Sequence, residues 1–209
     1  MGPEEIVKGI YIVGSSDITD PKDCSVYLID AGELILIDAG AGASVEAITG
    51  NIARLGLDPA KITTVILTHC HIDHVGGAHV FKKQFGPRIV MHELDAGAVE
   101  RGDDRMTAAH WYGVTFAPLS VDVKISGEQH RLKFPRGDVV CLHTPGHTPG
   151  SISVYTDTLA GRVLFGQDIH GPFLAEFGAD ISRWQKSMEK LLALKADILC
   201  EGHFGVYRP

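Results

Sequence analysis

The chain has 209 residues and a mass of 22.5 kDa, with 44% hydrophobic and 22% charged residues, as in an ordinary globular protein. Its 26 acidic and 19 basic residues give a net charge of −7. An acidic chain without a basic run argues against nucleic acid or an anionic membrane as the partner. We therefore expect one domain over residues 1–209 that acts on a small-molecule substrate, and a homo-oligomer stays compatible with the sequence.

The N-terminus and the cysteines favour a cytoplasmic location. Acidic residues stand where a secretory signal would carry basic ones, and no apolar run approaches the roughly 18 residues of a membrane helix. The cysteines are widely spaced and form no CxxC motif; they are Cys24, Cys70, Cys141 and Cys200. Three of them lie in or beside apolar runs, which indicates buried, reduced thiols and no disulfide framework.

The first predicted element is a hairpin over residues 25–40, which read SVYLIDAGELILIDAG. LIDAG occurs twice, once before a turn at Ala31-Gly32 and once at the end of the returning strand. A tandem repeat is the alternative, but nothing continues its period. Residues 44–56 follow with apolar side chains at helical spacing, which predicts a helix.

The chain then continues with a strand over 63–68, a helix over 75–86 that ends at Gly86, and a strand over 88–92. Residues 93–118 are helical or irregular. The second half is rich in strands, which we predict at 121–126, 130–134, 138–144, 151–157, 162–167 and 197–200.

The last predicted helix begins with Ser182 as N-cap and Gln185 as the third helical residue. Its core-facing residues are predicted to be Trp184, Met188, Leu191 and Leu192. Both halves of the chain therefore mix strands with helices. This order of elements favours an α+β fold in which two sheets pack face to face with helices outside.

The segment LTHCHIDHVGG, residues 67–77, holds three histidines and an aspartate within six positions. In an extended loop successive side chains alternate sides, so His69 and His71 would point the same way. Asp73 and His74 follow where the chain turns into a helix, and they can face a second point nearby. Imidazole and carboxylate groups are ligands of zinc, iron and manganese. For an isolated HxH pair, a surface cluster of histidines is the alternative.

Three further ligand candidates follow predicted strands in the second half of the chain. His147 lies between two Pro-Gly pairs in LHTPGHTPGS, which fix a rigid loop. Asp168 in FGQDIHG and His203 in EGHFG each come just after a strand. We expect the sheets to bring these side chains to one edge, beside the histidines of the first half.

This succession of motifs resembles the metallo-β-lactamase superfamily, including its glyoxalase II-like metallohydrolases. The order is HxHxDH, TPGHTPGS, a strand-end aspartate and a C-terminal Gly-His pair, and it covers nearly the whole chain. The resemblance implies a four-layer αβ/βα sandwich of two mixed sheets, with a two-metal site at its edge.

Carried over by position, the resemblance also implies a role for each candidate. The ligands of the first metal would be His69, His71 and His147. Those of the second would be Asp73, His74 and His203, with Asp168 bridging both metals. Asp38, in the second LIDAG, matches the family's buried aspartate and would support the ligands without binding metal. Asp73 would also be a catalytic candidate that orients the nucleophile or relays its proton.

The activity implied is that of a metal-dependent hydrolase whose metal-bridging hydroxide attacks a small ester, thioester or lactone. Two metals about 3.5–4 Å apart can share such a hydroxide. We expect two divalent ions, zinc in the first place, with iron and manganese as alternatives. Two other functions stay open. One is a mononuclear non-haem iron persulfide dioxygenase, and the other is a metal-dependent binding or sensor protein without turnover.

The chain departs from each group that it resembles. True β-lactamases would carry Cys or Ser at the position of Asp168. Glyoxalase II-like thioesterases share all seven ligands, but HGPFLAEFG (170–178) replaces their Gly-Cys-Gly-Arg segment, and we expect no helical glutathione-binding domain after His203. Lactonases would carry a tyrosine at Gly171. Persulfide dioxygenases share the THCH tetrapeptide, Cys70 included, but would also carry the missing Gly-Arg segment.

Three side chains near these motifs have both a functional and a structural interpretation. His170 is a catalytic candidate that could reach the substrate or serve as an acid, whereas an exposed loop histidine is the simpler alternative. Trp111 and Tyr112 could belong to a lid that grips an acyl chain, whereas packing is the alternative. Glu201 and Gln167 flank ligand candidates and could support them.

Overall fold

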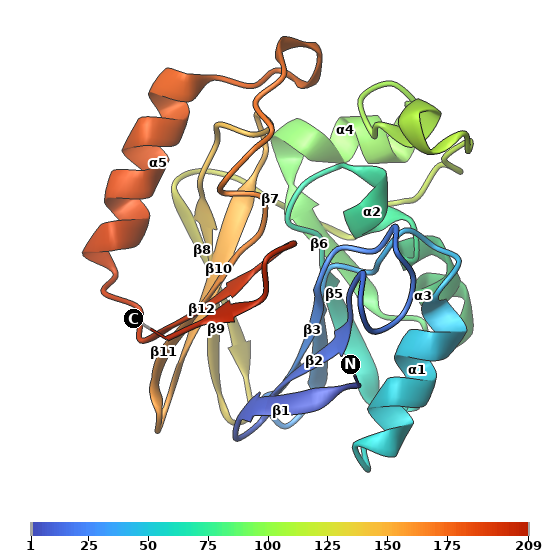
Figure 1. Ribbon diagram of the computed structural model, residues 1–209, viewed down its shortest axis with the longest axis vertical. Coiled ribbons are helices and arrows are strands. Elements are labelled where there is room, and N and C mark those ends of the chain that lie inside the picture. Colours follow the sequence, from blue (N-terminus) through green and yellow to red (C-terminus); the bar gives the residue numbers. More distant parts are fainter. Residues whose placement is uncertain (1, 209) are drawn as a thin grey trace.

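The computed structural model describes residues 2–208 and consists of two mixed β-sheets that face each other, with helices on both outer surfaces (Figure 1). The first sheet contains, in spatial order, β1 (Glu4–Val7), β2 (Ile10–Gly14), β3 (Val26–Asp30), β4 (Leu34–Ile37), β5 (Ile62–Ile66), β6 (Arg88–His92) and β7 (Val123–Ile125). The second contains β13 (Val206–Tyr207), β12 (Ile198–Glu201), β11 (Gly161–Gly166), β10 (Ile152–Thr158), β9 (Gly137–His143) and β8 (Gln129–Phe134).

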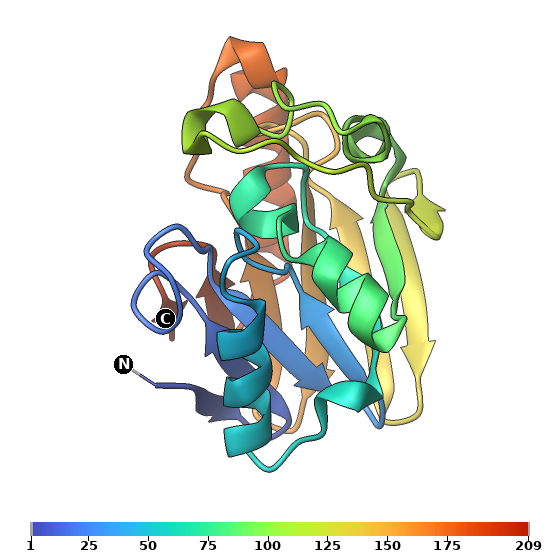
Figure 2. The same cartoon turned by 90° about the vertical axis from the view of Figure 1, so that its right-hand side faces the viewer.

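Helices cover the two outer faces, so the molecule has four layers (Figures 1 and 2). The α-helices are α1 (Val45–Arg54), α2 (Ile72–Val75), α3 (Ala78–Phe85), α4 (Glu93–Arg101) and α5 (Ile181–Ala193). Short 3₁₀ turns occupy Pro59–Lys61, Ala109–Tyr112 and Ala175–Phe177. The first sheet is covered by α1, α3 and α4, and the second by α5. The predicted α+β sandwich of two face-to-face sheets is confirmed.

Strand β4 has the sequence LILI, which is apolar at every position and does not alternate between apolar and polar residues. Leu34 and Leu36 pack against the outer helices, whereas Ile35 and Ile37 pack between the two sheets. Because both faces are covered, every position of the strand is buried. The hairpin prediction is confirmed as well, since β3 pairs antiparallel with β4 and Asp30 lies opposite Leu34 across the turn.

The helix predicted over 75–86 is wrong at its start. The chain forms the short helix α2, passes through Gly76 and Gly77, and only then begins α3; Gly86 ends α3 in the left-handed conformation as predicted. At Gly77 a side-chain carbon would lie 2.1 Å from the carbonyl oxygen of Ala39. The glycines therefore let the loop after β4 approach α2 closely, which the local pattern does not reveal.

Two predictions about α5 are also wrong. The N-cap is Asp180, whose carboxylate accepts hydrogen bonds from the backbone N–H groups of Ser182 and Arg183, at 2.8 and 3.1 Å. The helix therefore begins two residues earlier than the Ser182 motif indicates. Leu192 does not belong to the buried face, since it is 78% exposed. Leu191 and the half-buried Met188 pack against the second sheet.

The strands predicted in the second half of the chain lie within two residues of the observed strands. The region 93–118 contains α4 and one 3₁₀ turn, and β7 is three residues long, shorter than predicted. All four cysteines are free and buried, and burial raises the pKa of the Cys24, Cys141 and Cys200 thiols to about 12. Within residues 2–208, no helix has the length and apolar character needed to cross a membrane.

Candidate metal centre

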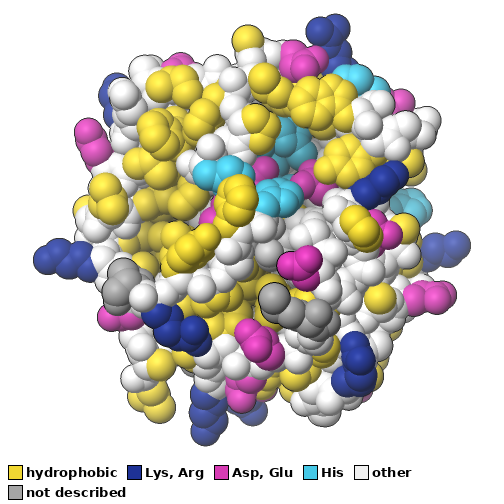
Figure 3. Space-filling model, in the orientation of Figure 1, with side chains coloured by type: hydrophobic (Ala, Val, Ile, Leu, Met, Phe, Trp, Pro, Cys, Tyr) yellow, Lys and Arg dark blue, Asp and Glu magenta, His cyan; other side chains and the backbone are white. Residues whose placement is uncertain are grey.

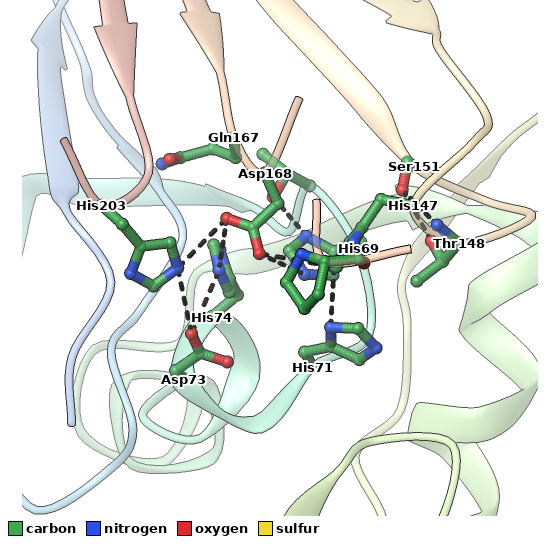
Figure 4. A network of polar contacts seen from close by, with 12 residues as sticks. His69, His71, Asp73, His74, His147, Thr148, Ser151, Gln167, Asp168 and His203 are labelled. Carbon is green, nitrogen blue, oxygen red and sulfur yellow. Dashed lines mark hydrogen bonds and ion pairs between the residues drawn. The ribbon is translucent and has the colours of Figure 1, made fainter. Parts of the chain in front are cut away.

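The ligand candidates of both halves meet at one edge of the sandwich, where four strands have their carboxyl ends. His69 and His71 follow β5, His147 follows β9, Asp168 follows β11 and His203 follows β12. Loops at the carboxyl ends of neighbouring strands lie side by side, so residues far apart in sequence can converge there. Figure 4 shows these side chains pointing toward a common centre.

The first cluster consists of His69, His71, His147 and Asp168, all buried, with one nitrogen or oxygen from each lying within 4.8 Å of the others. The Asp168 Oδ2 atom lies 3.7 Å from His69 Nε2 and 3.4 Å from His147 Nε2. His71 faces the cluster with Nδ1, which lies 2.9 Å from His147 Nε2. Three nitrogens and one oxygen at this spacing form a set of donors that suits a divalent metal ion.

The second cluster consists of Asp73, His74 and His203, and its ligand atoms also lie within 4.8 Å of one another. Asp73 Oδ2 lies 3.4 Å from His74 Nε2 and 3.3 Å from His203 Nε2. The other oxygen of Asp168, Oδ1, lies 3.4 Å from His74 Nε2 and 3.1 Å from His203 Nε2. Asp168 therefore faces the first cluster with one oxygen and the second with the other. Its backbone is left-handed, with φ 52°.

Asp38 lies behind both clusters and fixes the orientation of two histidines. His74 Nδ1 donates to Asp38 Oδ2 at 2.7 Å, and Thr68 Oγ1 donates to the same oxygen at 2.8 Å. Thr68 Oγ1 also lies 3.2 Å from His69 Nδ1, so it can accept a hydrogen bond from that ring. Because Nδ1 of each ring is held by a hydrogen bond, Nε2 is the atom through which His69 and His74 would bind a metal ion.

His147 is held in the same way by a different partner. Its Nδ1 donates to the carbonyl oxygen of Pro172 at 2.8 Å, which leaves Nε2 as the free acceptor. Burial and the neighbouring histidines lower the pKa of His69 well below its usual range and that of His71 to about 3. These imidazoles are therefore neutral at physiological pH, as a metal ligand has to be.

In the second cluster, carboxylates and histidines shift one another's pKa values. Burial would raise the pKa of Asp168, but the facing His74 and His203 side chains hold it well below its usual range. Conversely, burial would lower the pKa of His203, but its contacts with Asp168 and Asp73 raise it to about 9. The buried carboxylates of Asp73 and Asp168 therefore favour positive charge in the second cluster, and a divalent cation would supply it.

Several atoms of the two clusters have no hydrogen-bond partner within the described residues. They are His69 Nε2, His71 Nε2, His74 Nε2 and Asp168 Oδ1, and all four are buried. Leaving such polar atoms buried and unpaired is unfavourable, so native proteins rarely do it without a reason. The donor types, their spacing and these unpaired atoms together fit two metal ions that share Asp168.

One buried carboxylate at the centre, Asp95 at the start of α4, was not predicted from the sequence. Asp95 Oδ2 accepts from Cys70 N at 3.1 Å and from Thr148 Oγ1 at 2.7 Å, while Oδ1 accepts from Gly150 N at 2.7 Å. It thereby joins the loop that carries His69 and His71 to the loop that carries His147. No metal-binding motif surrounds Asp95, so the sequence offered no signal for this role.

His170 lies at the rim of the metal centre and contacts Glu201. Its Nδ1 atom lies 2.5 Å from Glu201 Oε1, and the other oxygen of Glu201 accepts from the backbone N–H groups of His203 and Phe204. The His170 ring is 5.9 Å from the His203 ring, between centroids. Gln167 instead points to the backbone, donating to the carbonyl oxygen of Ser25 at 3.0 Å.

A cavity of about 290 Å³ opens over the clusters, as Figure 3 shows on the face of the molecule where the histidines gather. Its lining includes the ligand candidates Asp73, His147, Asp168 and His203, together with His170. Trp111 and Tyr112 also line the cavity. Tyr112 additionally packs against the core between the first sheet and its helices. The packing interpretation is therefore confirmed for Tyr112, whereas Trp111 is 52% exposed, and a lid that grips an acyl chain stays a prediction.

The fold and the site together define the protein as a two-sheet sandwich with a His/Asp metal-binding cluster at its edge. The sequence profile of the Metallo-beta-lactamase superfamily matches residues 19–203. The chain therefore belongs to this superfamily, as its motifs indicated.

Individual relatives agree with this assignment. The chain is 31% identical over 194 residues to the "Beta-lactamase-like protein 2 homolog" of Drosophila melanogaster, covering 87% of the chain but only 59% of that protein. It is 32% identical over 153 residues to "Hydroxyacylglutathione hydrolase GloC" of Haemophilus influenzae, covering 69% of the chain and 67% of that protein. Among solved structures, BJP-1, a subclass B3 metallo-beta-lactamase of Bradyrhizobium japonicum, aligns with a TM-score of 0.83 at 27% identity, covering 97% of the chain and 78% of BJP-1.

Proposed function

We propose that this protein is a metallo-hydrolase that uses two divalent metal ions, zinc in the first place, to cleave a small ester, thioester or lactone. The observation that carries the proposal is Asp168, whose two oxygens face two separate groups of histidines. A carboxylate in this position can bridge two ions. When bound, such a pair of ions lowers the pKa of a water molecule and polarises a carbonyl oxygen.

Each residue of the site would have a distinct role in binding metal or water. His69, His71 and His147 would hold one ion, and Asp73, His74 and His203 would hold the other. Asp38 and Asp95 would keep the loops and the histidine tautomers in place. Asp73 lines the cavity, so its free carboxylate oxygen could also accept a hydrogen bond from the attacking water.

His170 is the residue that we propose for proton delivery to the leaving group. It lies on the cavity wall, outside both clusters, and Glu201 binds its Nδ1 side. The opposite nitrogen, Nε2, is the one left to face a substrate. The relationship to the "Hydroxyacylglutathione hydrolase GloC" supports a thioester among the candidate substrates, and the ester and lactone classes follow from the same chemistry.

Metal content and turnover test this function together. Protein purified without added metal is expected to carry two zinc ions per chain, or a mixed pair, by mass spectrometry. It should hydrolyse at least one member of a panel of esters, thioesters and lactones, lose that activity with a chelator and regain it with zinc. A single iron per chain, with oxygen uptake in the presence of a persulfide, would instead establish the dioxygenase. Bound metal without any turnover would favour a sensor.

The role of His170 gives a separate prediction. Because a positioned acid typically contributes about 10²-fold or more, we expect His170→Ala to lower kcat by about that factor on a substrate with a poor leaving group. The loss should be much smaller on an activated ester, whose leaving group needs no proton. Metal content should stay at the wild-type value. An equal loss on both substrates, or no loss at all, would exclude proton delivery by His170.

A further inference from the structure

His170 is restrained from several directions although it lines the cavity. Its side chain is 33% exposed, and the Phe204 ring packs edge-on against its ring, with centroids 4.5 Å apart. The backbone just before it is held by Trp184, whose Nε1 donates to the carbonyl oxygen of Ile169 at 2.7 Å. A histidine on a free surface loop would not be held on its ring and its backbone in this way.

Glu201 is the polar partner of His170 and is almost fully buried, at 4% exposure. It ends β12, opposite Gly166 at the end of β11. Glu201 Oε1 accepts from His170 Nδ1 at 2.5 Å, and Oε2 accepts from the backbone N–H groups of His203 and Phe204 at 2.6 and 2.9 Å. Within residues 2–208, no lysine or arginine forms an ion pair with Glu201. Because burying a carboxylate is costly unless it is hydrogen-bonded, these three donors are what holds it there.

The two oxygens of Glu201 serve different parts of the site. Oε2 holds the turn that carries the ligand candidate His203, and a neutral amide oxygen could hold that turn as well. Oε1 accepts from an imidazole on the cavity wall, and this contact is not needed to hold the turn. A carboxylate that binds one ring nitrogen of a histidine fixes its tautomer and orientation, so that the other nitrogen can accept or pass on a proton.

We propose that Glu201 is a positioning residue that acts through His170. It keeps the ring proton on Nδ1 and turns Nε2 toward the cavity, beside the second cluster, since the His170 and His203 rings lie 5.9 Å apart. Because the same carboxylate holds the His203 turn, it also sets the place of the His170 ring relative to the metal centre. The use of Nε2 in proton delivery rests on the proposed hydrolase function, whereas the tautomer rests on these contacts alone.

The variant Glu201→Gln separates the functions of the two oxygens. The two backbone N–H groups can only donate, so the amide oxygen of glutamine would face them and its NH₂ group would face His170. The ring would then accept on Nδ1 and carry its proton on Nε2. NMR chemical shifts of the imidazole nitrogens report this change on isotope-labelled, zinc-loaded protein, at a pH where the ring is neutral. The signals are assigned by their absence in His170→Ala. We expect a protonated Nδ1 in the wild type and a protonated Nε2 in Glu201→Gln.

Turnover provides the second readout. Residues that orient a functional group typically contribute about 10- to 100-fold, so Glu201→Gln should lower kcat about tenfold on a substrate with a poor leaving group. KM and the content of two zinc ions should stay at their wild-type values, because the His203 turn keeps its acceptor. In a His170→Ala background the same substitution should change kcat by less than about twofold, since its effect passes through the ring.

Two further variants control for the substitution and for the turn. Glu128→Gln is the matched control, because the Glu128 side chain is 79% exposed and pairs with Lys190 on the surface. It should change neither the tautomer of His170 nor kcat. Glu201→Ala removes both oxygens and leaves two backbone N–H groups without their acceptor. It should therefore also weaken binding of the second zinc ion, which Glu201→Gln should not do.

The outcomes separate this inference from the proposed function. An unchanged His170 tautomer in Glu201→Gln would overturn the positioning role. An equal loss of kcat with and without His170, or the loss of one zinc ion in Glu201→Gln, would overturn it too, because Glu201 would then act on the metal loop. A changed tautomer without any loss of kcat would exclude a role of this pair in proton delivery. The expected tautomers in a protein that hydrolyses no ester, thioester or lactone would support the positioning role and overturn the hydrolase.

Discussion

Replacing Asp168 by asparagine is expected to abolish high-affinity binding at both metal sites and to lower hydrolytic activity at least about 100-fold. Asp168 Oδ2 faces His69 and His147, and Asp168 Oδ1 faces His74 and His203. An asparagine can present only one oxygen, and its amide group would direct hydrogen atoms at one of the two clusters. Because a single change removes a shared ligand, both ions should be lost together.

Metal content by mass spectrometry and hydrolysis of the best substrate are measured on the same preparation of the variant. Asp157→Asn is the matched control, because it is the same substitution at a surface position. Asp157 forms an ion pair with Arg162 at the far end of β10. It should retain two ions and full activity. If Asp168→Asn kept both ions, Asp168 would not be a bridging ligand. If it kept one ion and full activity, hydrolysis would need only a single metal.

Much of this centre could be predicted from the sequence because each ligand candidate lies at the end of an apolar run. A strand buried on both faces produces a continuous apolar stretch, and the polar residue that ends it marks the edge of the sheet. His69, Asp168 and His203 were all identified in this way, and the structure brings them together. Parallel pairing of β11 with β12 sets Gly166 opposite Glu201, and Asp168 and His203 each follow two residues later, so they lie side by side.

The features that escaped prediction depend on contacts between distant segments. Asp95 joins two ligand loops, but around it the sequence only shows the start of a helix. Both Glu201 and His170 flank ligand candidates in the sequence, but their contact with each other exists because β12 lies next to β11. The interruption of the helix at Gly76 and Gly77 exists because the loop after β4 passes close by. Local patterns encode elements and their ends, whereas these contacts are fixed only by the packing of the sheets.

The second large effect is expected for Asp38→Asn, which should weaken metal binding at both sites by about 10- to 100-fold without removing any ligand. Asp38 is fully buried and accepts from Thr68 N with Oδ1, and from Thr68 Oγ1 and His74 Nδ1 with Oδ2. Asparagine fits the same space and tolerates the left-handed backbone at this position, where φ is 62°. It cannot accept all three hydrogen bonds, because one oxygen becomes an amide nitrogen.

The consequence of Asp38→Asn depends on which hydrogen-bond donor faces the new amide nitrogen. If the amide nitrogen faces His74, that ring has to move its proton to Nε2, which blocks the atom that faces the second cluster. If it faces Thr68 N, a buried N–H is left unpaired, at a cost of about 1–3 kcal/mol in the free energy of unfolding. Thr68→Val is the informative partner variant, because it removes only the hydroxyl that links Asp38 to His69. Cobalt titrations followed by visible absorption should therefore show weakened binding of both ions in Asp38→Asn and of the first ion alone in Thr68→Val. Wild-type titrations in Asp38→Asn would mean that the ligands hold their orientation without this carboxylate.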